Sequence, residues 1–280
     1  IPPNFLKQFN YAKQFKQWKK FYDFKNKFTI IQKPSFAYTY LGFNLNNEKF
    51  KDLRIRQALS LAIDRQELVD ILFFGYGKIC NGPFLPDSFA YNEKIKPITQ
   101  NIEKAKELLK ELGYDENNPF TFEVVTNTGN DTRINTAQIL QYQLEKVGVK
   151  MTIRVMEWQA FLNTVVHPKK FDAVILGWSL GLMPDAYPLW HSSSDKLGGF
   201  NLVSYKNEKV DKLIEDGINT INREELGKIY KEIFKIISDD LPYLFLYIPD
   251  GITVVNKEIK NVEPSFIGIM HNQKDWELEQ

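Results

Sequence analysis

Apolar and polar residues follow one another along the chain with two different periods. Continuous or alternating apolar runs, which predict strands, lie at 28–32, 36–44, 120–126, 149–156, 171–176, 243–248 and 252–255. Apolar stripes with a repeat near 3.6 residues, which predict helices, lie at 53–74, 102–112, 133–147, 158–166, 207–221 and 223–238. Strands that alternate with helices predict an α/β lobe with helices on both faces of its sheet.

Residues that favour helix ends support several of these boundaries. Asn101, Asn207 and Asn222 precede predicted helices, and their side chains can accept hydrogen bonds from the first free backbone N–H groups. Gly113 follows the helix over 102–112, at a position where a left-handed conformation is favourable. These helices are therefore predicted with defined ends.

The segment 171–190 combines a buried strand with a turn-rich loop. The apolar run over 171–176 is followed at once by Gly177, Trp178, Gly181 and Asp185. Open α/β sheets place ligand crevices at such strand ends, so an aromatic ring and a carboxylate here indicate a binding site. The alternative, in which Trp178 covers a core and Asp185 starts a helix, fits this segment equally well.

Composition and charge narrow the classes of function. The 280 residues are 43% hydrophobic and 14% aromatic, which is enough for a substantial core. Thirty-six Lys and Arg residues against 35 Asp and Glu residues give a net charge of +1, so bulk charge gives no reason to expect a nucleic-acid partner. No uncharged apolar run of about 18 residues is present to span a membrane. Because the chain starts at Ile1 without Met, we expect it to be a piece of a longer protein.

Residues 4–28 are a local exception, because lysines are interleaved with aromatic residues there. Such a pattern could bind single-stranded nucleic acid through base stacking and phosphate contacts. It also fits one or two amphipathic helices with solvated lysines. The near-neutral charge of the remaining chain favours the helices.

Residue types that carry catalysis or bind metals are sparse. Cys80 is the only cysteine, and His167, His191 and His271 lie far apart in the sequence. There is no serine elbow, no cysteine with a nearby histidine and no glycine-rich phosphate loop. We therefore expect a binding protein rather than an enzyme, with no catalytic residue, no cofactor and no metal site.

Several motifs resemble the extracellular solute-binding proteins of ABC importers, in the class that binds dipeptides, oligopeptides and nickel. The stretch 40–69, YLGFNLNNEKFKDLRIRQALSLAIDRQELV, is similar to the family signature. It is followed in order by NGPFLP at 81–86, EKAKELLKELGY at 103–114, LEKVGVK at 144–150 and FDAVILGW at 171–178. The resemblance covers residues 28–262, and its motifs are specific in combination.

The resemblance implies a fold and a division into domains. In that family two lobes close on a ligand, and this chain would supply one lobe of the periplasmic-binding-protein-like fold (type II, peptide-binding class), with a mixed sheet and helices on both faces. Residues 1–43 would be a remnant of the N-terminal lobe, 44–247 the C-terminal ligand-binding lobe, and 248–280 a segment that returns to the N-terminal lobe. One wall of the cleft would lie upstream of Ile1.

The resemblance also implies which residues bind the ligand. Trp158 and Trp178 match two tryptophans that line the peptide pocket in oligopeptide-binding relatives, with a core or helix-packing role as the alternative. Arg133 lies close to an arginine that binds a ligand carboxylate in dipeptide-binding relatives, but an exposed first-turn residue fits it equally well. Tyr247, on the strand over 243–248, completes this set.

One position departs from the family pattern. Peptide-binding members carry an acid three residues after the matching tryptophan, where it pairs with the ligand's α-amine; here that position is Gly181, and Asp185 is the nearest acid. A buried ammonium without a partner is costly, so either Asp185 substitutes or the ligand is not a free-amine peptide. We expect the Asp185 carboxylate to face away from the cleft as a helix N-cap, and the ligand to be recognised without an amine clamp.

The function implied by the resemblance is the solute-binding component of an ABC transporter. Such a component captures a small peptide or related solute and hands it to the permease, as a monomer in the periplasm or at the outer face of the cytoplasmic membrane. The alternative is the ligand-sensing domain of a transcription regulator, because a similar domain occurs behind a DNA-binding domain in some regulators.

Overall fold

The structure, a computed structural model, describes residues 24, 26–181, 183–265 and 268–279. Most of the segment 4–28, with its two alternative interpretations, lies outside these residues. The strands are β1 (Phe28–Pro34), β2 (Ala37–Phe43), β3 (Gly77–Ile79), β4 (Thr121–Asn127), β5 (Lys150–Met156), β6 (Ala173–Ser179), β7 (Tyr243–Asn256), β8 (Ile259–Lys260) and β9 (Glu277–Leu278). Within the described residues, the first seven form one sheet in the order β1-β7-β2-β6-β4-β5, and β3 pairs with β7.

The sheet is mixed. β4 runs parallel to β5 and to β6, whereas β2 pairs antiparallel with both β6 and β7. Parallel neighbours need a crossover connection, and here a helix between β4 and β5 provides it. The α/β class and the mixed sheet expected from the sequence are both present.

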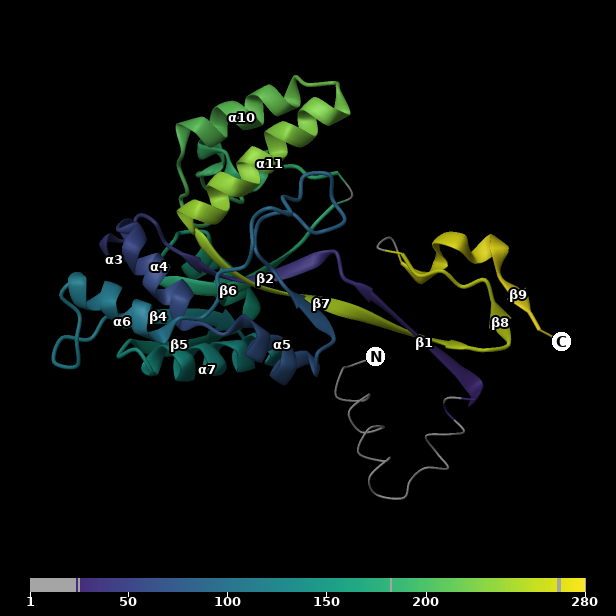
Figure 1. The fold of residues 1–280 in the computed structure, drawn as a ribbon, viewed down its shortest axis with the longest axis horizontal. Coiled ribbons are helices and arrows are strands. Elements are labelled where there is room, and N and C mark those ends of the chain that lie inside the picture. Colours follow the sequence, from purple (N-terminus) through teal and green to yellow (C-terminus); the bar gives the residue numbers. More distant parts are fainter. Residues whose placement is uncertain (1–23, 25, 182, 266–267, 280) are drawn as a thin grey trace, which may run out of the picture.

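Helices cover the two faces of the sheet (Figure 1). One face packs against α3 (Glu48–Lys51), α4 (Leu53–Ala62), α5 (Arg65–Phe73), α6 (Ile102–Glu111) and α7 (Asp131–Glu145). The other packs against α8 (Trp158–Phe161) with the π-helix Leu162–Val166, and against α9 (Tyr187–Trp190), α10 (Glu208–Ile218) and α11 (Arg223–Asp240). Ser192–Ser194 is a 3-10 helix that follows α9, and Ile269–Asp275 is a 3-10 helix between β8 and β9.

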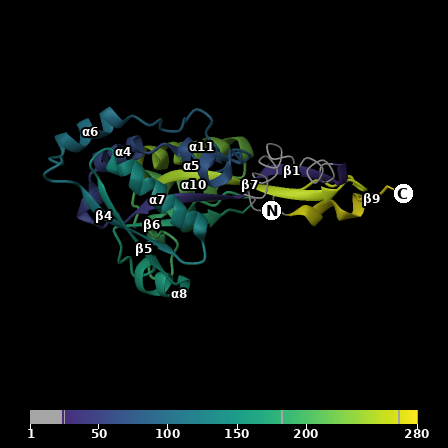
Figure 2. The same cartoon turned by 90° about the horizontal axis from the view of Figure 1, so that it is seen from below.

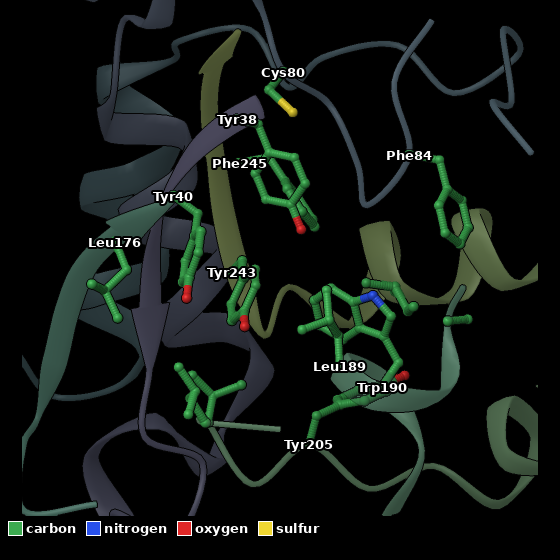
Figure 3. Close-up of a cluster of buried hydrophobic side chains, with 14 of the residues drawn as sticks. Tyr38, Tyr40, Cys80, Phe84, Leu176, Leu189, Trp190, Tyr205, Tyr243 and Phe245 are labelled. Carbon is green, nitrogen blue, oxygen red and sulfur yellow. The ribbon is translucent and has the colours of Figure 1, made fainter. Parts of the chain in front are cut away.

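The strands contribute side chains to two separate cores, because successive side chains of a strand point to opposite faces of the sheet. On β2, Tyr38 and Tyr40 join the core beneath α9, α10 and α11, whereas Leu41 and Phe43 join the core beneath α4–α7. The first core is rich in buried aromatic side chains (Figure 3). This aromatic core lies directly under the candidate site described below.

The long strand β7 extends beyond the body of the lobe. Its first residues pair with β2, and Asp250 to Asn256 pair with β1, forming a two-stranded ribbon that projects to one side (Figures 1 and 2). β8 and β9 lie at the far end of this ribbon. The two strands expected at 243–248 and 252–255 are thus one continuous strand.

The expected domain boundary after Phe43 needs correction. β2 lies between β6 and β7 in the main sheet, so residues 37–43 are part of this lobe rather than of an N-terminal remnant. The strand was assigned to the wrong side of the boundary because its partners, β6 and β7, are more than a hundred residues away in the chain. The ribbon strand β1, by contrast, pairs with β7 alone among the strands that the structure describes.

The single helix expected over 53–74 is two helices. Ile63 is extended, and the Asp64 side chain accepts hydrogen bonds from the backbone N–H groups of Gln66 and Glu67, which starts α5. The apolar residues keep the same helical period on both sides of the break, so the period gave no sign that the helix is interrupted. The N-caps predicted at Asn101, Asn207 and Asn222 are confirmed.

No helix in the described part of the chain is both long enough and apolar enough to pass through a membrane.

Candidate functional site

Trp178 is the centre of the candidate site. It lies within β6, paired with Tyr38 of β2, rather than on the loop after the strand as the sequence suggested. Its ring is half-buried, lies 6.4 Å from the Tyr40 ring at an interplanar angle of 14°, and meets Phe200 edge-on at 5.9 Å. Its Nε1 donates a hydrogen bond to the Tyr243 hydroxyl at 3.3 Å. One edge of the indole is therefore held by the aromatic core, and Phe200 contacts the ring from another side.

Two open cavities flank Trp178, and both are lined by Trp178 and Ser179. The larger has a volume of about 540 Å³ and the smaller about 360 Å³. We call them the apolar compartment and the polar compartment. Each of them falls within the size range of small-molecule sites.

The apolar compartment has mainly aromatic and aliphatic walls. These come from the residue before β2, from the loop over 83–89 and from the segment between β6 and α9. Charged groups also line it: Asp87, Asp185 and Arg223. Its principal apolar residues are Phe36, Phe84, Leu85, Phe89, Leu180, Met183, Leu189, Trp190 and Phe200.

Gly181 and Asp185 both line the apolar compartment. Gly181 is exposed and carries no side chain to meet an ammonium. Asp185 is exposed, and its Oδ1 accepts a hydrogen bond from the backbone N–H of Tyr187, the first residue of α9, at 3.0 Å. The N-cap itself is Ala186. Asp185 is therefore hydrogen-bonded to the first residue of α9 without being its N-cap, and it lines the cavity, whereas the sequence suggested an N-cap that faces away from the cleft.

The polar compartment contains Arg133 and Tyr247. Arg133 projects from the first turn of α7, whose N-cap Asn130 accepts a hydrogen bond from the Arg133 backbone N–H. Its Nη1 donates to the Asn127 side-chain oxygen at 2.9 Å. Tyr247 lines the compartment but is buried, and its hydroxyl is hydrogen-bonded to Thr136 at 2.8 Å. The other lining groups include Thr39, Asn130, Thr132 and Ser179.

The guanidinium of Arg133 has no carboxylate partner within the residues that the structure describes. Burial lowers its pKa from the usual value, while the Tyr40 and Tyr247 hydroxyls act in the opposite direction. Trp158 covers it, with the guanidinium carbon 5.8 Å from the centre of the indole ring, a cation–π contact. Trp158 is 37% exposed. A half-buried cation held by an aromatic ring and a neutral amide is suited to bind an anionic group.

The aromatic core beneath the site is neutral. Burial raises the pKa of the Tyr243 hydroxyl to about 12, and it raises the pKa values of Tyr38 and Tyr40 well above their ordinary value. Tyr40 stacks on Tyr243 with ring centres 3.8 Å apart. These rings form a rigid platform for Trp178 and bring no ionised group to the site.

Five of the six residues suggested by the sequence line the two compartments. Trp178 lines both, Arg133 and Tyr247 line the polar compartment, and Gly181 and Asp185 line the apolar compartment. Trp158 lines neither and is linked to the site through its contact with Arg133. The sequence did not indicate the wall formed by Phe36, Phe84, Phe89 and Phe200, because these residues come from segments distant in the chain. Among the described residues, no three His, Cys, Asp or Glu side chains gather to hold a metal ion.

Comparison with known proteins identifies the family. The family model of the bacterial extracellular solute-binding proteins, family 5 Middle, matches residues 6–200. The chain belongs to this family. The oligopeptide-binding protein AppA of Bacillus subtilis is 34% identical over 266 residues, which are 90% of this chain and 49% of AppA.

Solved structures of family 5 relatives have the same fold. AppA from Bacillus subtilis in complex with a nonapeptide gives a TM-score of 0.79 at 33% identity, covering 96% of this chain and 55% of that chain. NikZ from Campylobacter jejuni in complex with Ni(L-His) gives a TM-score of 0.77 at 30% identity, covering 90% of this chain and 54% of that chain. The chain spans about half the length of the curated relatives it matches. The structure is a periplasmic-binding-protein-like lobe of the peptide-binding class.

Proposed function

We propose that this chain forms one lobe of the solute-binding component of an ABC transporter and captures a peptide or similar small solute for import. Its relatives are named for the solutes they bind, oligopeptides in AppA and nickel in NikA of Staphylococcus aureus, which favours transport over transcriptional regulation. The component works outside the cytoplasmic membrane, delivers its solute to a permease, and acts as a monomer without catalysis. The second lobe closes the cleft over Trp178.

The observation that carries this proposal is the Arg133 guanidinium beside Trp178. It faces a polar compartment with no carboxylate of the described residues to pair with it. A ligand carboxylate entering this compartment meets a pre-positioned cation, and the Trp158 ring limits its access to water. A side chain of the same ligand can occupy the apolar compartment on the other side of Trp178. The site therefore fits a solute with an anionic end and an apolar group.

In the full-length protein, we expect Arg133→Gln to weaken binding of a peptide with a free carboxyl terminus by at least about tenfold, because a charge-assisted hydrogen bond contributes about 1.5–3 kcal/mol. The same peptide with an amidated terminus should bind both proteins alike. Isothermal titration calorimetry with both peptides measures the difference. Arg154→Gln is a matched control, since Arg154 lies on the edge strand β5 and pairs with Glu123. Equal losses for the free and amidated peptides would place Arg133 outside the carboxylate site.

We further propose that the ligand is recognised without an amine clamp. Asp185 is exposed and already accepts a hydrogen bond from the start of α9, and the usual acid position is Gly181. Free and N-acetylated forms of one peptide should therefore bind within about threefold of one another, and Asp185→Asn should change neither affinity by more than this factor. Asp87→Asn tests the other carboxylate of the apolar compartment. A tenfold or larger preference for the free amine that disappears in Asp185→Asn would show that Asp185 is the amine anchor.

A further inference from the structure

A third cavity lies away from Trp178 and shares no lining residue with either compartment. Its volume is about 310 Å³, and it lies where the α4–α5 junction, the loops after β3 and before α6, and the end of α11 meet β7. We call it the Arg65 cavity. Its lining residues are Leu53, Gln57, Arg65, Cys80, Asn81, Ile95, Lys96, Ile98, Ser238, Asp239, Leu241 and Phe245.

Arg65 is a buried cation with only neutral partners. It is 6% exposed, and its guanidinium donates to the carbonyl oxygens of Phe245 at 2.8 Å, Ser60 at 3.2 Å and Ile98 at 3.2 Å, and to the Ser60 hydroxyl at 2.8 Å. A guanidinium carries five N–H groups, so four are used. The fifth, on Nη2, finds no acceptor among the residues that the structure describes.

A buried charge without an ionic partner is costly, and hydrogen bonds to carbonyl groups compensate for it only in part. Burial lowers the pKa of Arg65 to about 10, so the group still carries its positive charge at neutral pH. Arg65 thus brings a permanent cation with a spare donor to the wall of the cavity.

Two further groups in the same wall can bind an anion. The amide of Gln57 is half-buried and has no hydrogen-bond partner within the described residues. Lys96 is oriented by a hydrogen bond from its Nζ to the Glu93 carbonyl oxygen at 3.0 Å. The single acid in the wall, Asp239, is paired with Lys235 at 2.6 Å. The balance of charge in the cavity is therefore positive.

We propose that the Arg65 cavity binds a small oxyanion, either inorganic phosphate or the carboxylate or phosphate group of a small metabolite. Arg65 and Gln57 would donate hydrogen bonds to it from inside, and Lys96 would approach it from the exposed side. This ligand is separate from the transported solute, because the cavity is lined by other residues. An anion there would connect α4, α5, β7 and the loop over 95–98, and so stabilise the half of the lobe that lies behind the solute site.

Cys80 provides a direct reporter. It is the only cysteine of the chain, lines the cavity and is 1% exposed. In Figure 3 it lies at the Tyr38 and Phe245 end of the aromatic cluster. Its thiol donates to the Gly82 carbonyl oxygen at 3.4 Å, and burial raises its pKa to about 12, so it reacts only when this region opens. An anion that stabilises the closed cavity must slow this reaction.

The experiment measures the rate at which dithiodipyridine modifies Cys80 in the 280-residue chain, in phosphate, acetate or chloride at equal ionic strength. We expect about 20 mM phosphate or acetate to slow the reaction at least about fivefold relative to chloride, with saturation as the concentration rises. Slowing by phosphate alone identifies a phosphate site, and slowing by both anions identifies a general oxyanion site.

Variants separate binding from general stabilisation of the fold by phosphate. Gln57→Leu and Lys96→Met leave every hydrogen bond of Arg65 in place, and each should abolish most of the slowing. Lys94→Met, an exposed lysine outside the cavity, should retain it. Equal rates in all three salts, or slowing that persists in both Gln57→Leu and Lys96→Met, would overturn the proposal.

Discussion

Trp190→Ala should lower the free energy of unfolding of the lobe by about 3–5 kcal/mol, as expected for truncation of a fully buried aromatic side chain. Trp190 is 0% exposed, with its ring 4.8 Å from Tyr243, 5.9 Å from Tyr205 and 6.3 Å from Phe245. Figure 3 shows it beside the aromatic residues Tyr243 and Phe245 of the sheet and close to Tyr205. Alanine would leave a cavity that these large, rigid neighbours cannot fill.

Urea denaturation followed by near-ultraviolet circular dichroism measures this loss. Trp158→Ala is the matched control, because its side chain is 37% exposed and packs mainly against Phe161 and Arg133. We expect Trp158→Ala to cost about 1 kcal/mol or less, in the range of partly exposed positions. If the two substitutions destabilise the lobe equally, the Trp190 side chain does not contribute to the core as its burial indicates.

Local signals in the sequence were sufficient to predict several helix ends. The Asn101, Asn207 and Asn222 side chains cap their helices because an N-cap bond joins residues only two or three positions apart. Gly113 adopts a φ of 84°, the left-handed conformation expected after a helix. The break at Ile63 was missed because the apolar stripe needed to cover the core continues from α4 into α5.

The pairing of strands that are distant in the chain could not be predicted from local sequence signals. The apolar pattern predicts that β2 is a strand, but its place between β6 and β7 depends on contacts with residues distant in the chain.

The arrangement of the candidate site also depends on contacts between segments that are distant in the chain. The resemblance to solute-binding proteins indicated Trp178 and Arg133, but only the fold shows that Trp178 separates two compartments of different polarity. The Arg65 cavity lacked any sequence signal, because its three donors, Gln57, Arg65 and Lys96, come from three separate segments.

Trp178→Ala should weaken ligand binding more than it lowers stability, whereas Trp190→Ala should mainly lower stability. In the full-length protein we expect it to weaken binding of a peptide about 10- to 100-fold, equivalent to about 1–3 kcal/mol, because the ring borders both compartments. The effect on stability should be smaller than for Trp190→Ala, since Trp178 is half-buried and its Nε1 makes one hydrogen bond, to Tyr243.

Trp178→Phe separates the two roles of the side chain. Phenylalanine keeps an aromatic face against Tyr40 and Phe200 but loses the donor to the Tyr243 hydroxyl. We expect it to recover most of the affinity, to within about fivefold of the native protein, if the aromatic surface is what the ligand contacts. Calorimetry with one peptide, together with the melting temperature of each variant, measures both effects. Should Trp178→Ala lower the melting temperature as far as Trp190→Ala does and leave affinity unchanged, Trp178 belongs to the core and the two compartments do not form the solute site.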